Sequence, residues 1–221
     1  MNIAMMLSGL FFLLIIITNI TSEKFGTKTF SDLDSDAKLQ MINKDPKKFK
    51  ISVVLLLIEH VCIISLSLTL FIAFSPYNII LGIVWTISRI GEASVQIYNK
   101  KSFWELLNIS GKYSDASDDE KNPLVDSARS ILKTKNSTFN FTQVLFSIGT
   151  FAYSILFVSY GVVPIFIGWF GIVASLIYGI GNGVMLVKND FKGVWGLGGL
   201  LILLFELALG GWLLFFSPFF T

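Results

Sequence analysis

A chain of 221 residues, of which 53% are hydrophobic and only 14% charged, has too few charged groups to cover a water-soluble domain, since such domains carry roughly 25%. The formal net charge of +2, without a basic face, excludes a nucleic-acid-binding protein. We therefore expect one all-α membrane domain over residues 1–221, with membrane lipids as its neighbours and no identifiable protein partner.

The amino-terminal half predicts three transmembrane helices. Residues 3–20 form the first apolar run, and because no Lys or Arg precedes it we expect a retained helix rather than a signal peptide. Residues 51–74 and 78–98 are the second and third spans, since about 20 residues cross the hydrocarbon core. In the polar segment 21–50, Ser31 is expected to cap a short helix that Pro46 ends.

The second polar segment, residues 99–140, predicts two helices at the membrane surface. Phe103, Trp104, Leu106 and Leu107 favour a short helix lying in the interface. Further on, Pro123 suits the first position of a second helix capped by Asn122. Both are expected to be separate from the spans.

The carboxy-terminal part predicts three more spans, at residues 141–160, 164–187 and 194–216. Small residues recur every four positions on the fifth span, at Gly171, Ser175, Gly179 and Gly183, which favours close helix packing in lipid. The fold prediction is thus a six-helix transmembrane bundle with two interfacial helical segments, in the cell membrane as a multi-pass protein.

The side of the membrane on which the two polar segments lie is predicted from their lysines and arginines. Every Lys and Arg except Arg89 follows span one, three or five. The positive-inside rule therefore places these segments in the cytoplasm and both termini outside.

Ionisable residues inside the spans predict the functional site, because a charge in the bilayer core is costly. Glu59 and Arg89 each lie roughly 14 to 17 Å from the same membrane surface at 1.5 Å per residue. Glu206 is near the middle of its span, and Glu92 is about one turn from Arg89. We expect these four side chains to meet inside the bundle.

Neighbouring polar residues extend this predicted binding site. Gln96 shares a helical face with Arg89 and Glu92, and Tyr178 with Asn182 gives the fifth span a polar face. His60 adjoins Glu59 but points about 100° away from it, so it is more typical of a hydrogen-bonded core residue than of a ligand. Metal ligation by His60 with the glutamates stays open.

One arginine facing three glutamates suggests that at least one glutamate carries a proton at neutral pH. Such a site suits a proton-coupled or cation-binding protein. The alternative is a buried ion pair that only fixes the register of the helices.

No cofactor or metal site is predicted. The single Cys62 excludes an intrachain disulfide and the single histidine excludes a bis-histidine haem. Asp32, Asp34 and Asp36 resemble the start of a calcium-binding loop. However, Ala37 stands where such a loop has glycine, and Asn43 stands where it has its bidentate glutamate.

Four short segments resemble an uncharacterised prokaryotic family of membrane proteins, catalogued as domain of unknown function 4386. They are residues 89–93 (Arg-Ile-Gly-Glu-Ala), residues 55–59 (Leu-Leu-Leu-Ile-Glu), the hairpin at 146–172 with Pro164 and Trp169, and residues 205–207 (Phe-Glu-Leu) with Trp212. The resemblance implies a six-helix membrane protein and a family role for the four charged residues, but no activity. It also implies that the long polar segments lie outside the cell, whereas the distribution of lysines and arginines places them in the cytoplasm.

Three functions remain open. The first is a non-enzymatic protein that binds or moves a small solute, lipid or ion through the polar interior. The second is an intramembrane enzyme that acts on a lipid-like substrate, with a protonated glutamate as acid and Arg89 holding an anionic headgroup. The third is a structural or partner subunit in which the charged cluster serves only folding. A water-open cavity at Arg89 favours the first, a cavity open to the bilayer the second, and an uninterrupted bundle the third.

Overall fold

The computed structural model describes residues 2–26, 34–188 and 192–216. Within these ranges all regular structure is α-helical, as the composition predicts. The helices are α1 (Asn2–Lys24), α2 (Ser35–Lys44), α3 (Pro46–Phe74), α4 (Ile79–Asn99), α5 (Lys101–Asp115), α6 (Asp118–Tyr160), α7 (Ile165–Val187) and α8 (Lys192–Phe215).

Five of the described helices, α1, α3, α6, α7 and α8, are long and apolar enough to cross a membrane. This is typical of a multi-pass membrane protein. The remaining long helix, α4, carries Arg89, Glu92, Gln96 and Asn99, which lower its mean hydropathy although all four are buried. Length and composition thus identify five candidate spans among the described residues, and the predicted count of six is not confirmed.

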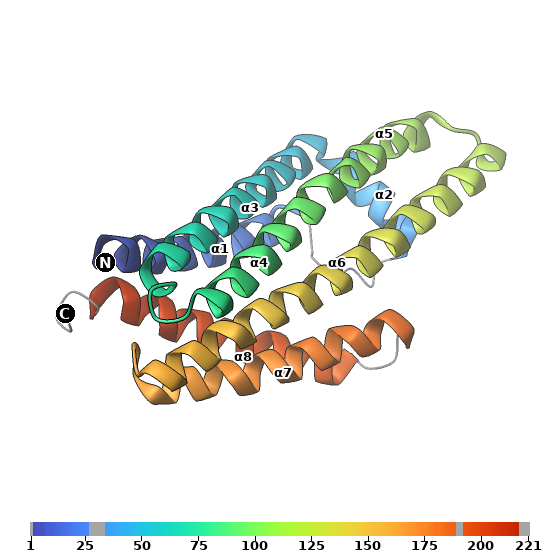
Figure 1. The fold of residues 1–221 in the computed structure, drawn as a ribbon. Coiled ribbons are helices and arrows are strands. Elements are labelled where there is room, and N and C mark those ends of the chain that lie inside the picture. Colours follow the sequence, from blue (N-terminus) through green and yellow to red (C-terminus); the bar gives the residue numbers. More distant parts are fainter. Residues whose placement is uncertain (1, 27–33, 189–191, 217–221) are drawn as a thin grey trace.

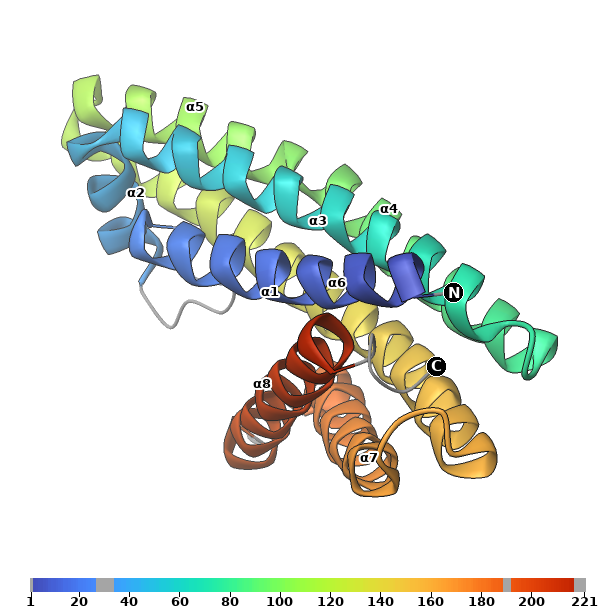
Figure 2. The same cartoon turned by 90° about the vertical axis from the view of Figure 1, so that its left-hand side faces the viewer.

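Helices α1, α3, α4 and α6 run roughly along one direction, with two polar helices at one end, and α7 and α8 are inclined to α1, α3 and α4 (Figure 1 and Figure 2). The start of α1, the end of α8 and the α3–α4 and α6–α7 turns lie at one end of the molecule, and α2 and α5 at the other. Neighbouring pairs include α1 with α3, α4 with α6, and α6 with α7. In the second view α8 crosses close to α1 and then diverges from it (Figure 2).

Helix α6 corrects the prediction of a separate surface helix that starts at Pro123. It is one helix of 43 residues, about 65 Å long at 1.5 Å per residue, and it includes the predicted span 141–160. Ser117 caps it in a capping box with Glu120. Pro123 lies in the second turn, where its missing N–H removes a single hydrogen bond close to the helix end.

The predicted interfacial helix is α5, but it is packed on other helices rather than isolated. It continues roughly in the direction of α4 after Lys100 (Figure 1). Of the four apolar residues that predicted this helix, Phe103 and Leu106 are buried and only Trp104 is substantially exposed. With α2, the first half of α3 and the first half of α6 they form a second apolar cluster, which includes Leu39, Ile42, Phe49, Val53, Leu56, Ala128 and Leu132.

Around the first polar segment, the predicted cap Ser31 lies outside the described residues. The short helix there is α2, which follows Asp34. Helix α2 ends just before Pro46, as predicted, but Pro46 is also the first residue of α3. The side chain of Asp45 caps α3 by accepting a hydrogen bond from the Lys48 backbone N–H at 2.9 Å. The second apolar helix is thus longer than the predicted span 51–74, since proline is well suited to a first helical turn.

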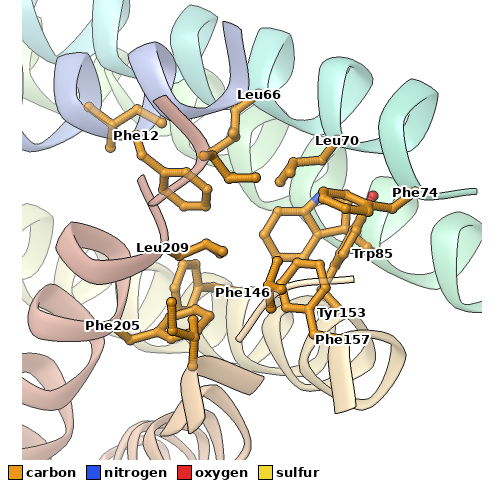
Figure 3. Packing of buried hydrophobic residues seen from close by; sticks show 14 of the residues in the cluster. Phe12, Leu66, Leu70, Phe74, Trp85, Phe146, Tyr153, Phe157, Phe205 and Leu209 are labelled. Atoms are coloured by element: carbon orange, nitrogen blue, oxygen red, sulfur yellow. The ribbon is translucent and has the colours of Figure 1, made fainter. Parts of the chain in front are cut away.

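An aromatic group joins α3, α4 and α6 in the main apolar core (Figure 3). The Trp85 and Tyr153 rings meet edge to face with centroids 4.4 Å apart, and Phe74 meets Phe157 at 5.1 Å. Each such pair is worth about 0.5–1.5 kcal/mol beyond the area it buries. The contact between Trp85 and Tyr153 holds α4 against α6 about one helical turn before Arg89.

Glycines set the closest helix approaches. At the α1–α8 crossing, a Cβ on Gly9 would lie 2.7 Å from the Gly210 carbonyl oxygen, so the two backbones touch. On α7, a Cβ on Gly171 would lie 2.6 Å from Cε2 of Phe205. The predicted small-residue stripe is confirmed at Gly171, Ser175 and Gly179, but a Cβ on Gly183 meets nothing within 4 Å.

Replacement of Gly171 by valine is expected to destabilise the protein by about 1–3 kcal/mol, because the new methyl groups overlap Phe205 and the Ser154 side chain. Thermal unfolding in detergent, followed by loss of the monodisperse species, measures the effect. Gly183→Val is the matched control on the same helix and should have a much smaller effect. Equal destabilisation by the two variants would contradict the packing described.

Candidate functional site

Arg89 and Glu92 form an ion pair within α4. The distance from Arg89 Nη1 to Glu92 Oε2 is 2.6 Å, and their side chains are 2% and 5% exposed. The guanidinium also lies over aromatic rings, 4.5 Å from the Phe146 centroid and 5.3 Å from that of Trp85. The positive charge is therefore held by one carboxylate and two ring faces, which offset part of its desolvation.

A cavity of about 440 Å³ adjoins this ion pair, which is within the usual size range for small-molecule sites. The predicted residues Glu59, Arg89, Glu92 and Glu206 all line it, from α3, α4 and α8. Tyr178 of α7 lines it as well. The structure thus brings together five of the eight predicted binding residues around one space.

Two polar atoms in the cavity wall lack hydrogen-bond partners among the described residues. One oxygen of Glu59 accepts a hydrogen bond from Nδ2 of Asn19 at 3.1 Å, but its other oxygen, Oε2, is buried and unpartnered. Nε of Arg89 is unpartnered too. Leaving a buried polar group unsatisfied costs about 1–3 kcal/mol, so both atoms retain unused hydrogen-bonding capacity in residues of the cavity wall.

Negative charge predominates in the wall of the cavity. The described lining residues include one cation, Arg89, and four carboxylates, Glu23, Glu59, Glu92 and Glu206. Glu206 is 8% exposed and makes no hydrogen bond or ion pair with another described residue. The rest of the wall is largely apolar and aromatic, with Phe139, Phe146, Tyr178 and Trp195.

A smaller cavity of about 50 Å³ lies next to the first, toward α5. Its wall includes the predicted residues His60 and Gln96 and two lysines, Lys100 and Lys135. Asn19, Glu59, Ile63, Glu92, Phe139 and Gln143 line both cavities. The polar interior is therefore continuous from the centre of α4 to its carboxyl end.

The polar contacts of the smaller cavity connect α4 to α6. Gln96 Nε2 donates to Thr142 Oγ1 at 2.6 Å, and its Oε1 accepts from Lys100 Nζ at 3.4 Å. His60 Nδ1 is hydrogen-bonded to the Leu56 carbonyl oxygen one turn earlier on α3. His60 is thus a buried residue with a hydrogen bond to its own helix, in agreement with the prediction that it is a hydrogen-bonded core residue.

Asn182 differs from the prediction, because it lines neither cavity. It is fully buried, and its Oδ1 accepts a hydrogen bond from Nε1 of Trp195 at 3.1 Å. Its Nδ2 donates to the Tyr178 carbonyl oxygen at 2.9 Å, while the Tyr178 hydroxyl donates to Gln143 Oε1 at 3.1 Å. Asn182 therefore positions the Trp195 ring at the cavity wall rather than contacting the cavity.

Sequence reasoning missed several wall residues. Trp195, Lys100 and Lys135 are not among the predicted binding residues, yet the first lines the larger cavity and the two lysines line the smaller one. The signal for Lys100 was present, because it follows Arg89 and Gln96 at helical spacing on the buried face of α4. A polar amide near the end of an otherwise apolar run could also have indicated Asn19. In the structure its side chain donates a hydrogen bond to Glu59.

Exposed lining residues on both α1 and α8 indicate that the larger cavity opens sideways between these helices. These helices touch at Gly9 and Gly210 and diverge toward the other end of the molecule (Figure 2). At the rim of the opening, Ile20 is 46% exposed and Leu200 is 53% exposed. Exposed apolar side chains on two apolar helices are typical of a surface that faces lipid.

The glutamates do not form a metal centre in this structure. Among the described residues, no three His, Cys, Asp or Glu side chains are grouped closely enough to hold a metal ion. Glu59, Glu92 and Glu206 instead occupy separate parts of the cavity wall.

These features define a helical multi-pass membrane protein with a charged internal cavity. A family model described as domain of unknown function (DUF4386) matches residues 7–216, and the chain therefore belongs to that family. This confirms the resemblance drawn from the short motifs. No curated protein and no solved structure gives a significant match.

Breaking the buried ion pair from one side is expected to cost about 3–5 kcal/mol of unfolding free energy, because the remaining charge stays buried. Arg89→Met and Glu92→Met should each be more destabilised than the double variant, in which no charge is stranded. Unfolding titrations in mixed micelles give the three values for a double-mutant cycle.

The control for this cycle is Arg129→Met. Arg129 pairs with Asp126 at 3.0 Å with the same three-residue spacing, but both side chains are more than 60% exposed. Its loss should cost less than about 1 kcal/mol. A double variant as unstable as the sum of the singles would show that Arg89 and Glu92 are not coupled.

Proposed function

We propose that this protein binds a cationic, partly apolar small molecule in the 440 Å³ cavity, without catalysing a reaction on it. The observation that carries this function is the excess of carboxylates over cations in the wall. Among the chemistries open to a polar membrane interior, binding of a cation best matches that excess.

The charge balance favours a positively charged ligand. With all groups ionised, Arg89 and the three glutamates Glu59, Glu92 and Glu206 would give a formal charge of −2. Carboxylates that share a low-dielectric space repel one another, and either protons or a bound cation must relieve that repulsion. A ligand cation would meet the unpartnered Glu59 Oε2 and the free carboxylate of Glu206.

The aromatic wall favours an organic cation over a small metal ion. Phe139, Tyr178 and Trp195 offer ring surfaces, and positive groups are attracted to such faces by about 0.5–2 kcal/mol each. Phe146 is already covered by Arg89. The sideways opening, with Ile20 and Leu200 at its rim, supplies a route from the bilayer for an amphiphilic molecule.

The same opening favours a second candidate, an intramembrane enzyme that acts on a lipid-like substrate. In that case Arg89 would hold an anionic headgroup through Nε, the nitrogen that has no partner in the described structure. Binding of an anion in preference to a cation would support this candidate.

We further propose that α4 is the sixth span and that the protein resides in the cell membrane. The polar residues of α4 are buried, whereas its outer face carries Ile80, Ile83 and Ile87, which are 70%, 44% and 67% exposed. An even number of crossings also accounts for the start of α1 and the end of α8 at the same end of the molecule (Figure 1).

Tetraphenylphosphonium is expected to bind the purified protein, and tetraphenylborate, which has nearly the same shape and the opposite charge, is expected not to bind. Calorimetric titration in an uncharged detergent measures both. Glu206→Gln should weaken tetraphenylphosphonium binding at least about tenfold, or about 1.4 kcal/mol, because it removes the carboxylate that no described residue neutralises.

Glu105→Gln is the matched control, because Glu105 is an exposed glutamate on α5 that lines neither cavity. It should leave the affinity unchanged. Equal binding of the two probes, or equal effects of the two variants, would contradict the proposed cation site.

The orientation in the membrane is expected to follow the lysine-rich segments, which places α5 in the cytoplasm. Lys112→Cys puts a thiol on the exposed side of α5, while the native Cys62 is buried. A membrane-impermeant maleimide should label this variant in inverted vesicles and not in intact cells. Labelling in intact cells would instead support the orientation that the family resemblance implies.

A further inference from the structure

Glu59 stands at the junction of the two cavities. It lines the 440 Å³ cavity and the 50 Å³ cavity, and it is 8% exposed. Glu92 also lines both, but its Oε2 is bound to Arg89. Glu59 is held by the neutral amide of Asn19, and its second oxygen has no partner among the described residues. Of these two shared carboxylates, Glu59 is the one that is not already neutralised by direct contact with a cation.

The smaller cavity leads from Glu59 toward the polar helices. A space of about 50 Å³ is large enough for water, and it is lined by amides and charged groups that water can bond. Lys100 and Lys135 lie at the side near α5, each with Nζ 5.4 Å from the Phe103 ring centroid. This space therefore suits a proton better than it suits an organic molecule.

Lys100 has the character of a group that exchanges protons near neutral pH. It is 5% exposed, and burial lowers its pKa to about 8, although the charge of Glu59 opposes that shift. It follows the last residue of α4, at the end where α5 begins. A proton that leaves Glu59 thus has a basic group between it and the polar end of the molecule.

We infer that a proton and the cationic ligand compete for Glu59, the ligand arriving through the larger cavity and the proton leaving through the smaller one past Lys100. The inference rests on the proposed cation site and adds a coupling to it. When the cation binds, the O–H bond of the Glu59 carboxylic acid breaks, the carboxylate faces the cation, and the proton passes to water in the smaller cavity. No bond of the ligand changes.

Other charged groups share this environment and set the balance between the two bound forms. They face Glu59 or its cavities from every neighbouring long helix: Glu23 on α1, His60 on α3 itself, Arg89, Glu92 and Lys100 on or after α4, Lys135 on α6, Tyr178 on α7 and Glu206 on α8. Arg89 is paired with Glu92, which leaves Glu206 as the second carboxylate available to the cation.

Calorimetric titration of the full protein with tetraphenylphosphonium, in buffers that differ in ionisation enthalpy, tests the inference by counting protons. About one proton per bound cation should be released. The affinity should rise with pH, by up to about tenfold per pH unit where one proton is exchanged. The sign follows from competition, since a high proton concentration favours the protonated glutamate.

Glu59→Gln keeps the shape of the side chain and the oxygen that accepts from Asn19, but removes the exchangeable proton. It should bind tetraphenylphosphonium more weakly, with no proton release and no rise with pH. Glu206→Gln should bind more weakly as well, yet still release a proton. Lys100→Gln should slow the release seen by a pH dye in stopped flow without abolishing it.

The possible outcomes distinguish failure of the proton exchange at Glu59 from failure of the cation-binding site itself. Binding without proton release in the native protein, or release that persists in Glu59→Gln, overturns the exchange while the cation site stands. Absence of tetraphenylphosphonium binding overturns both. Should Glu59→Gln fail to purify in folded form, the pH dependence and proton count of the native protein decide the matter alone.

Discussion

The burial of Arg89 is the constraint on which the rest of the structure depends. A guanidinium inside an apolar helical bundle must be offset by opposite charge and by polarisable surface. Glu92 supplies the charge at 2.6 Å, and Phe146 and Trp85 supply ring faces. Those rings come from α6 and α4, so satisfying one side chain also determines how these helices face each other. The edge-to-face contact of Trp85 with Tyr153 extends the same arrangement toward the opposite end.

The interior then combines rigid and open parts. Glycines bring α7 against α6 and α8, and bring α1 against α8 at one end. Because α1 and α8 cross rather than run parallel, close contact at Gly9 and Gly210 leaves a gap at their other ends (Figure 2). Residues of both helices line the cavity. Its wall takes carboxylates from four helices, α1, α3, α4 and α8, and side-chain hydrogen bonds such as Trp195 to Asn182 keep its shape.

The polar helices at the far end are part of the same construction. Helix α6 runs without a break from the capping box at Ser117 to Tyr160, so α2 and α5 pack on the same helix that carries Phe146 and Gln143. Lys100, at the α4–α5 junction, connects this end to the charged interior through Gln96. The proposed exchange at Glu59 uses this layout, with one approach from the lipid side and one from the polar end.

The amino-acid sequence by itself determined the helical class, the approximate extent of the long helices, the family and the charged residues of the site. Those features depend on local composition and helical periodicity, which act over a few turns. Tertiary structure alone decided that α6 is continuous past Pro123, that Asn182 supports Trp195 instead of facing the cavity, and that Asn19, Lys100 and Lys135 join the site. Each of these depends on which distant segment packs alongside, and the cavity likewise has a wall made of residues from six helices, whose mutual arrangement no local pattern encodes.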